Sequence, residues 1–200
     1  MAYINLAPFI KNLQILIMDV DGVLTSGRII YNSEGIEHKR FNVTDGLGIV
    51  MLRDTDIKTA IITGRESDIV DLRARELGID YIFQGYPIKL PVYEELKREL
   101  HLPDSAFGFI GDDLIDLDVM RQVGFSATPS DAHPAVKENA HYVCRHSGGA
   151  GAVREVIDLI FAFRRGEFDA INYIPVQLLE HWQDIVWKKL STNGIKKEIL

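Results

Sequence analysis

The chain has 200 residues, 46% hydrophobic and 26% charged, a composition typical of one folded domain and too apolar for a disordered chain. The 29 acidic residues exceed the 22 basic ones, and the net charge of −7 argues against a protein that binds nucleic acid or an anionic membrane. A single cysteine, Cys144, excludes an intrachain disulfide and a cysteine-rich zinc site.

The sequence does not predict a membrane protein or a secreted one. Its longest apolar run, Leu159–Phe163, is far shorter than the ~18 residues that a membrane helix needs. The first residues lack the basic segment and the long apolar stretch of a signal peptide. We therefore expect a cytoplasmic protein without a membrane or nucleic-acid partner.

Short apolar runs alternate with amphipathic stretches along the chain. The runs expected to form buried strands are Leu13–Val20, Lys58–Thr63, Phe107–Gly111 and Phe125–Thr128. The stretches with helical spacing are Asp45–Thr55, Ser67–Leu77, Lys89–Leu100, Leu114–Val123 and Pro134–Asn139. Gly78 and Gly124 follow two of these helices and are expected to cap them. The alternation predicts a doubly wound, Rossmann-like α/β fold, a parallel sheet with helices on both faces and ligands at the carboxyl ends of its strands.

One segment after the first strand breaks this alternation. Arg28–Tyr31 and Glu37–Val43 flank the turn-rich residues 32–35, so we expect a β-hairpin insertion at about 28–43. Such a hairpin is marginally stable alone and needs a packing partner.

The C-terminal third contains a glycine-rich stretch, Ser147–Gly151, followed by an apolar helix at Ala152–Phe163. Beyond it the pattern weakens, although Val176–Leu190 has helical spacing. We expect one domain over residues 1–165 and a helical extension over 166–200.

The strongest chemical signal is a pair of carboxylates, Asp19 and Asp21, at the end of the first strand. The chain must curl at Gly22, so the two side chains can approach one point from different directions. A pair of this kind suits a nucleophile and a general acid/base. A plain turn also carries this pattern, but the apolar pair and Thr25 that follow favour a functional site.

Two further motifs could hold an anion. Thr63 and Gly64 end the second strand and would present a hydroxyl and backbone amides, unless Thr63 or Ser67 only caps the next helix. Lys89 begins a helix, where its charge opposes the helix dipole, unless it is an ordinary surface lysine.

The third strand is followed by Asp112, Asp113 and Asp116. Acids are favoured in a first helical turn, but here they also form an oxygen-rich edge that suits Mg²⁺. We expect Asp112 to be the inner ligand and Asp116 to orient the site from behind it. The histidines lack metal-pair spacing, and Cys144 lacks a nucleophile signature.

These four motifs, in this order over residues 13–128, resemble the haloacid dehalogenase-like superfamily. The resemblance implies a Mg²⁺-dependent phosphatase in which Asp19 is the nucleophile, Asp21 the acid/base, and Thr63, Gly64 and Lys89 hold phosphate. It implies that Mg²⁺ binds Asp19, the Asp21 carbonyl and Asp112, with Asp113 and Asp116 behind them. Only the hairpin follows Asp21, so the chain is of the capless type.

Residues 41–46, 131–134 and 145–155 narrow the resemblance to the octulosonate 8-phosphate phosphatases, which implies a phosphorylated sugar-acid substrate and a role in lipopolysaccharide biosynthesis. It also implies a homotetramer in which the glycine-rich tail closes a neighbour's site. We expect Ser147–Gly151 to be a flexible loop that carries Arg145 or His146 towards a neighbour's Asp19 pocket. The residues implied to line the substrate site are Asp21, Asn42, Val43, Thr44, Asp45, Gly46, Arg65, Arg73 and Lys89.

Two positions depart from the family pattern, because Thr44 and Val50 stand where basic residues are common. The alternative substrate is a nonulosonic acid 9-phosphate, although that family more often has an acid at Arg65. A phospho-receiver has its lysine last, whereas Lys89 precedes Asp112 here. A glycosyltransferase would leave Thr63 and Lys89 without a role. A catalytically silent scaffold would not need the complete set of motif residues, Asp19, Asp21, Thr63, Lys89 and Asp112.

Overall fold

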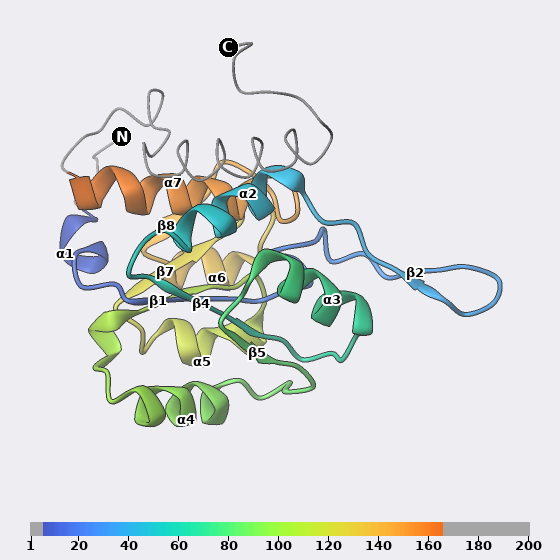
Figure 1. Cartoon of the computed structure of the whole chain (residues 1–200), viewed down its shortest axis with the longest axis horizontal. Coiled ribbons are helices and arrows are strands. Elements are labelled where there is room, and N and C mark those ends of the chain that lie inside the picture. Colours follow the sequence, from blue (N-terminus) through green and yellow to red (C-terminus); the bar gives the residue numbers. More distant parts are fainter. Residues whose placement is uncertain (1–5, 166–200) are drawn as a thin grey trace, which may run out of the picture. The chain divides into compact units, whose positions relative to one another are not determined.

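A six-stranded parallel sheet forms the centre of the computed structural model, which describes residues 6–165 (Figure 1). The strand order is β5-β4-β1-β6-β7-β8. The strands are β1 (Ile15–Met18), β4 (Lys58–Ile62), β5 (Tyr81–Phe83), β6 (Phe107–Ile110), β7 (Phe125–Thr128) and β8 (Tyr142–Val143). This arrangement confirms the doubly wound α/β fold. The helix expected at Val176–Leu190 and the rest of the 166–200 extension lie outside the described residues.

Helices cover both faces of the sheet. They are α1 (Ala7–Ile10), α2 (Val43–Leu52), α3 (Asp68–Leu77), α4 (Leu90–Leu100), α5 (Leu117–Met120), α6 (Pro134–Asn139) and α7 (Ala152–Arg165). In Figure 1, α2 and α7 lie on one face of the sheet, and α4 and α5 lie on the other. Within residues 6–165, none of these helices has the length and apolar character needed to cross a membrane.

Strand β1 is central and fully buried, with β4 and β6 as its neighbours. Met18 pairs with Ile61 on one side and with Ile110 on the other, so the three strands end at nearly the same level. A continuous apolar run can occupy such a strand because both faces of a parallel sheet are covered. The residues that follow these three strands therefore meet at one edge.

The main differences from the predicted elements are short or local. Strands β5 and β8 and helix α1 were not predicted, since two to four residues are too few for a periodic pattern. The helix expected at Leu114–Val123 is divided into a 3₁₀ turn at Leu114–Asp116 and the short α5. A capping box between Asp113 and Asp116 closes the first of these turns.

One of the two predicted glycine caps is confirmed. Gly78 has left-handed φ and ends α3 as expected. The prediction for Gly124 is wrong, because α5 already ends at Met120. Gly124 is needed instead for space, since a Cβ there would lie 2.7 Å from the Cα of Ser105.

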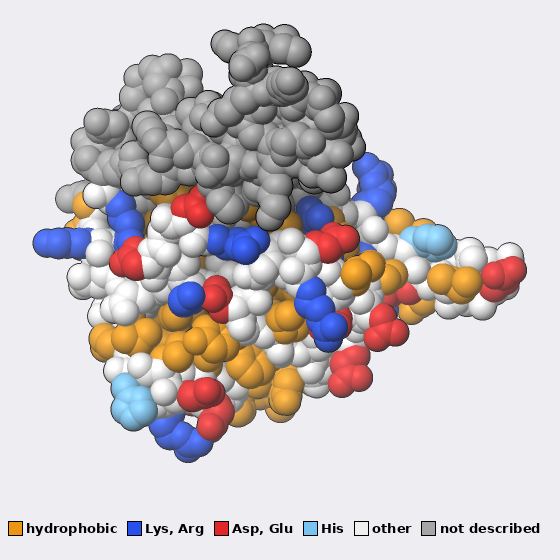
Figure 2. All heavy atoms as spheres, viewed as in Figure 1, with side chains coloured by type: hydrophobic (Ala, Val, Ile, Leu, Met, Phe, Trp, Pro, Cys, Tyr) orange, Lys and Arg blue, Asp and Glu red, His pale blue; other side chains and the backbone are white. Residues whose placement is uncertain are grey.

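The predicted hairpin is present as β2 (Ile30–Tyr31) paired antiparallel with β3 (Glu37–His38). It extends away from the sheet (Figure 1), and hydrophobic side chains lie along it in Figure 2. Ile29, Tyr31 and Ile36 are 60%, 58% and 53% exposed. The hairpin thus lacks apolar cover from its own chain within residues 6–165.

Candidate active site

The ends of β1, β4 and β6 bring Asp19, Thr63 and Asp112 to one edge of the sheet, as the sequence predicted. Asp19 and Thr63 are 5% and 3% exposed. Doubly wound sheets bind their ligands at this edge, at the carboxyl ends of the strands. Gly64 follows Thr63, and a Cβ there would lie 3.4 Å from Pro87 Cα, an ordinary contact distance.

Lys89 is buried completely, so it is not a surface lysine. It lies just before α4, and its Nζ is 2.9 Å from Asp19 Oδ1 and 2.6 Å from Asp116 Oδ1. Burial alone would lower the pKa of Lys89, but Asp19 and Asp116 outweigh burial and hold it above the usual value. Lys89 is therefore a fixed positive charge beside Asp19.

Asp116 supports this site, as expected. Its Oδ2 accepts hydrogen bonds from the backbone N–H groups of Asp112 at 2.9 Å and Asp113 at 3.2 Å. Gly111 permits the approach, because a Cβ there would lie 2.5 Å from Asp116 Cβ. The Asp113 side chain accepts from the Leu114 N–H at 2.7 Å and caps the 3₁₀ turn.

The carboxylate cluster has the donors that Mg²⁺ prefers. Oxygens of Asp19, Asp112 and Asp116 lie within 4.8 Å of one another. Asp112 Oδ1 is buried without a hydrogen-bond partner, which fits an oxygen that holds a cation. Both oxygens of Asp116 already accept hydrogen bonds, Oδ1 from Lys89 and Oδ2 from two backbone N–H groups, so Asp19 and Asp112 would hold the metal. The part of the Asp21 carbonyl stays a prediction.

The same crowding shifts the pKa of two carboxyl groups. Burial, with the charges of Asp19 and Asp116, raises the pKa of Asp112 to about 8. Burial also raises the pKa of Asp19, but Lys89 opposes this, and the result is about 6. Lys89 thus favours the ionised form of Asp19, which a nucleophile needs.

Gly22 shapes the loop that carries both acids. Its φ is +102°, and a Cβ there would lie 2.0 Å from Asp112 Oδ2. Only glycine combines that backbone conformation with this close approach. The curl predicted after Asp21 is confirmed.

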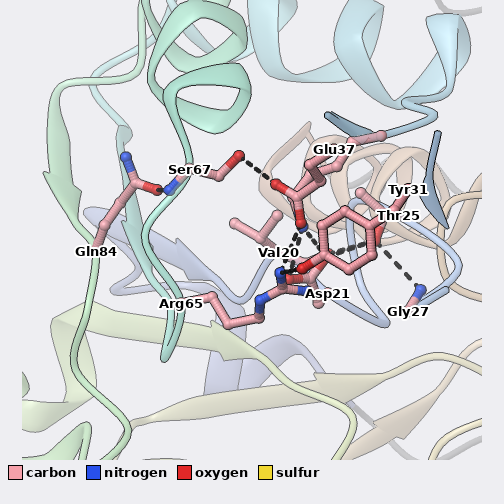
Figure 3. Close-up of polar contacts among 10 residues, drawn as sticks. Val20, Asp21, Thr25, Gly27, Tyr31, Glu37, Arg65, Ser67 and Gln84 are labelled. Carbon is pink, nitrogen blue, oxygen red and sulfur yellow. Dashed lines mark hydrogen bonds and ion pairs between the residues drawn. The ribbon is translucent and has the colours of Figure 1, made fainter. Parts of the chain in front are cut away.

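Asp21 is held by a residue that the sequence reasoning missed. Lys39 Nζ from the hairpin donates to Asp21 Oδ1 at 2.6 Å and to Oδ2 at 2.8 Å, and the Thr25 hydroxyl donates to Oδ1 at 3.2 Å. The available signal was the alternation of Glu37 and Lys39, two charged residues on one face of a hairpin strand. Figure 3 shows Asp21, Thr25 and Glu37 gathered at this point.

Arg65 faces the hairpin of its own chain. Its Nη2 donates to Glu37 Oε1 at 2.7 Å and to the Tyr31 hydroxyl at 3.3 Å (Figure 3). The hydroxyl of Ser67 bonds Glu37 Oε2 at 2.8 Å rather than capping α3. The prediction that Arg65 contacts a sugar acid stays untested.

Four of the predicted substrate-site residues surround a cavity of about 10 Å³: Asn42, Asp45, Gly46 and Arg73. A cavity of this size holds no more than a water, and the prediction that these four residues contact a sugar acid stays untested. Asp45 is turned inward, accepting from the backbone N–H groups of Gly151 and Arg154 at 3.2 and 2.8 Å. The two neighbours, Val43 and Thr44, are exposed instead.

The residues 147–151 are not a free linker, and the prediction of a flexible loop is wrong. The Gly149 N–H donates to the Val23 carbonyl at 2.9 Å, and a Cβ on Gly148 would lie 1.8 Å from the Gly22 carbonyl oxygen. The glycines are needed because this backbone packs directly on the loop after Asp21. The side chains of Arg145 and His146 are exposed, and their predicted reach towards a neighbour stays untested.

Comparisons with known proteins agree with this geometry, although no family model matches the chain. The chain is 50% identical over 149 residues to the 3-deoxy-D-manno-octulosonate 8-phosphate phosphatase KdsC of Yersinia pestis, covering 74% of this chain and 80% of the relative. The Escherichia coli K12 protein of that name is 45% identical over 159 residues, covering 80% and 84%. A Moraxella catarrhalis phosphatase structure of the same name, with magnesium, phosphate and KDO, has TM-score 0.79 and 44% identity, covering 82% and 94%.

Proposed function

Because the chain belongs to the 3-deoxy-D-manno-octulosonate 8-phosphate phosphatases of the haloacid dehalogenase-like superfamily, we propose that it hydrolyses 3-deoxy-D-manno-octulosonate 8-phosphate. The products are the free sugar acid and phosphate. Asp19 and Asp112 hold the Mg²⁺ that the reaction uses. The metal, when bound, neutralises charge on the phosphate and so lets an anionic nucleophile approach it.

The reaction passes through a phosphorylated aspartate. The Asp19 carboxylate attacks phosphorus, and the bond from phosphorus to the sugar oxygen breaks as Asp21 gives that oxygen a proton. A water then attacks the aspartyl-phosphate and loses a proton to Asp21, which restores Asp19 and releases phosphate. Thr63, Gly64 and Lys89 hold the phosphate during both steps.

The observation that carries this proposal is the buried Lys89 between Asp19 and Asp116. A fully buried ammonium is costly unless its neighbours are anionic, so the fold maintains a positive charge beside the nucleophile. Such a positive charge offsets the repulsion between an anionic phosphate monoester and the Asp19 carboxylate. A scaffold protein without catalytic activity has no need of it.

The direct experiment measures phosphate release from purified protein with Mg²⁺, comparing the octulosonate 8-phosphate with a nonulosonic acid 9-phosphate. We expect faster turnover of the former, loss of turnover with a chelator, and recovery on adding Mg²⁺. Asp19→Asn should abolish turnover while circular dichroism shows an intact fold, since the amide has the same shape but is not nucleophilic. Near-normal activity of that variant would disprove the aspartyl-phosphate route.

The proposal includes two broader features. The protein would act in the cytoplasm in lipopolysaccharide biosynthesis, which fits the single free thiol of Cys144 and is tested by cell fractionation. It would also assemble as a homotetramer through the exposed hairpins, because a site at an open sheet edge without a cap needs cover from a neighbour.

A further inference from the structure

Lys39, on the hairpin, contacts the catalytic loop, which is the loop that carries Asp21. Its side chain is only 2% exposed, although His38 and Arg40 on either side are exposed. Burying an ammonium costs several kcal/mol unless an anion is close. Here the anion is Asp21, whose two carboxylate oxygens lie 2.6 and 2.8 Å from Nζ.

A line of alternating charges continues from Lys39 into the body of the protein. Glu37 Oε1 lies 3.7 Å from Lys39 Nζ and 2.7 Å from Arg65 Nη2. Figure 3 shows Glu37 and Arg65 close together, with Ser67 on the far side of Glu37. The base of the hairpin is therefore joined to the catalytic loop and to the residues just before α3.

We propose that Lys39 is a positioning residue for Asp21, so that proton transfer at the site depends on the hairpin being folded against it. The inference rests on the proposed function, because it requires Asp21 to be the acid/base. Lys39 does not itself touch the substrate in this role. It sets where the Asp21 carboxylate lies.

The need for positioning follows from the geometry of Asp21. Its side chain is 21% exposed, and the loop itself holds the carboxylate through the Thr25 hydroxyl at 3.2 Å, a longer contact than the two from Lys39. An acid/base must lie within hydrogen-bond reach of the oxygen that it serves. A displacement of about 1 Å costs on the order of 100-fold in rate.

The contact also permits both proton-transfer steps. When Asp21 carries the proton for the leaving oxygen, one carboxyl oxygen holds it and Lys39 keeps the other. When Asp21 takes a proton from water, the same exchange runs in reverse.

The test compares Lys39→Met with Lys39→Arg on two substrates. The sugar-acid phosphate has a poor leaving group that needs a proton, whereas 2,4-dinitrophenyl phosphate has one that does not. For Lys39→Met we expect at least about a tenfold loss of kcat on the sugar-acid phosphate with KM changed less than about threefold. The burst of dinitrophenol release should change less than about twofold, and Lys39→Arg should recover part of the loss.

A matched control is Lys58→Met, which breaks an ion pair with Asp80 far from the site, where Nζ to Oδ1 is 3.1 Å and the lysine is 57% exposed. It should leave both rates unchanged. Equal losses on both substrates for Lys39→Met would overturn the proposal, because they would show a general effect on phosphate binding or on the fold.

A double-mutant comparison decides whether Lys39 acts through Asp21. Adding Lys39→Met to Asp21→Asn should cause no further loss, whereas a full additive loss would overturn the proposal. Failure of the proposed substrate would appear separately, as wild-type protein that turns over the dinitrophenyl ester and other, unactivated phosphates but not the sugar-acid phosphate. The same comparison is then made with β-glycerophosphate, an unactivated alkyl phosphate, with the same expectations.

Discussion

Asp19, Asp112 and Asp116 share one edge of the sheet with the buried ammonium of Lys89. Three carboxylates and one lysine leave an excess of negative charge in a region of low dielectric constant. The high pKa of Asp112, about 8, is the result. A divalent cation would remove the excess, so metal binding and stability are linked at this edge.

Asp112→Asn should make the metal-free protein more stable at pH 8. In the unfolded chain Asp112 ionises near its usual value of 3.8, whereas the folded group keeps its proton to about 8, so the wild type loses stability between these values. The amide removes that penalty, and we expect the melting temperature in EDTA to rise by about 3 °C.

Adding Mg²⁺ should raise the melting temperature of the wild type and not that of Asp112→Asn. Differential scanning fluorimetry in EDTA and in Mg²⁺ measures both effects. A variant that melts below the wild type and still responds to Mg²⁺ would contradict the assignment of Asp112.

Glu155 is also buried, and its ionised form stabilises the fold, whereas the ionised form of Asp112 destabilises it. Burial alone would raise its pKa, but hydrogen bonds from the Tyr142 hydroxyl, His146 and the backbone N–H of Arg145 outweigh burial and lower it to about 2. The stabilisation is therefore present above the unfolded value of 4.5 and is lost as the pH falls towards 2.

Glu155→Gln should lower the free energy of unfolding at pH 7 by about 2–3 kcal/mol. Between pH 5 and pH 2 its stability should change less steeply than that of the wild type. Urea unfolding at several pH values measures both expectations, and parallel curves for the two proteins would refute this account of Glu155.

At the scale of elements, the glycine-rich loop at 147–151 packs on residues 22–26, which directly follow the acid/base Asp21 in the same loop. The contact is between backbones, and the Asp131 side chain accepts from the Gly148 N–H at 2.9 Å. No side chain fits at Gly148, since a Cβ there would also lie 3.1 Å from the Thr25 carbonyl oxygen. The position of the acid/base loop thus depends on a distant part of the chain.

Gly148→Ala should reduce kcat/KM by about tenfold or more, because it displaces the loop that carries Asp21. Gly124→Ala is the matched control, since its Cβ would meet Ser105 Cα at 2.7 Å, away from the site. Both variants should melt at lower temperature. If activity per folded molecule falls equally in both, the loop at 147–151 has no special role.

The sequence predicted those parts of the site that directly follow a strand formed by a continuous apolar run. Asp19, Thr63 and Asp112 could be placed together because the strands before them end in runs of apolar residues. The partners of Asp21 and Arg65 could not, because a hairpin's direction depends on long-range contacts that local pattern does not contain. The packing of Gly148 could not be predicted either, because glycine is typical both of a turn and of close backbone packing.

At the scale of the whole molecule, the exposed hairpin needs another surface to pack against. Ile29, Tyr31 and Ile36 are each more than half exposed, and a two-stranded hairpin is marginal without packing. Copies of the same hairpin could cover one another around a symmetry axis.

Ile36→Asp should therefore lower the mass measured by light scattering at micromolar concentration from that of a tetramer to that of a smaller species. The charge would oppose burial of the hairpin face without touching the core. Circular dichroism checks that the fold is intact. A wild type that is monomeric and fully active would contradict the assembly.

The contact between the loop at 147–151 and the loop at 22–26 also bears on synthesis at the ribosome. Asp19, Thr63, Lys89 and Asp112 all emerge early, while the glycines that support Asp21 emerge after them. A nascent chain or a fragment ending at Cys144 therefore contains each motif residue but lacks the support for its acid/base loop. Such a fragment also lacks α7, which packs on α2, so it should turn over slowly, and a peptide starting at Arg145, supplied in trans, should restore its rate.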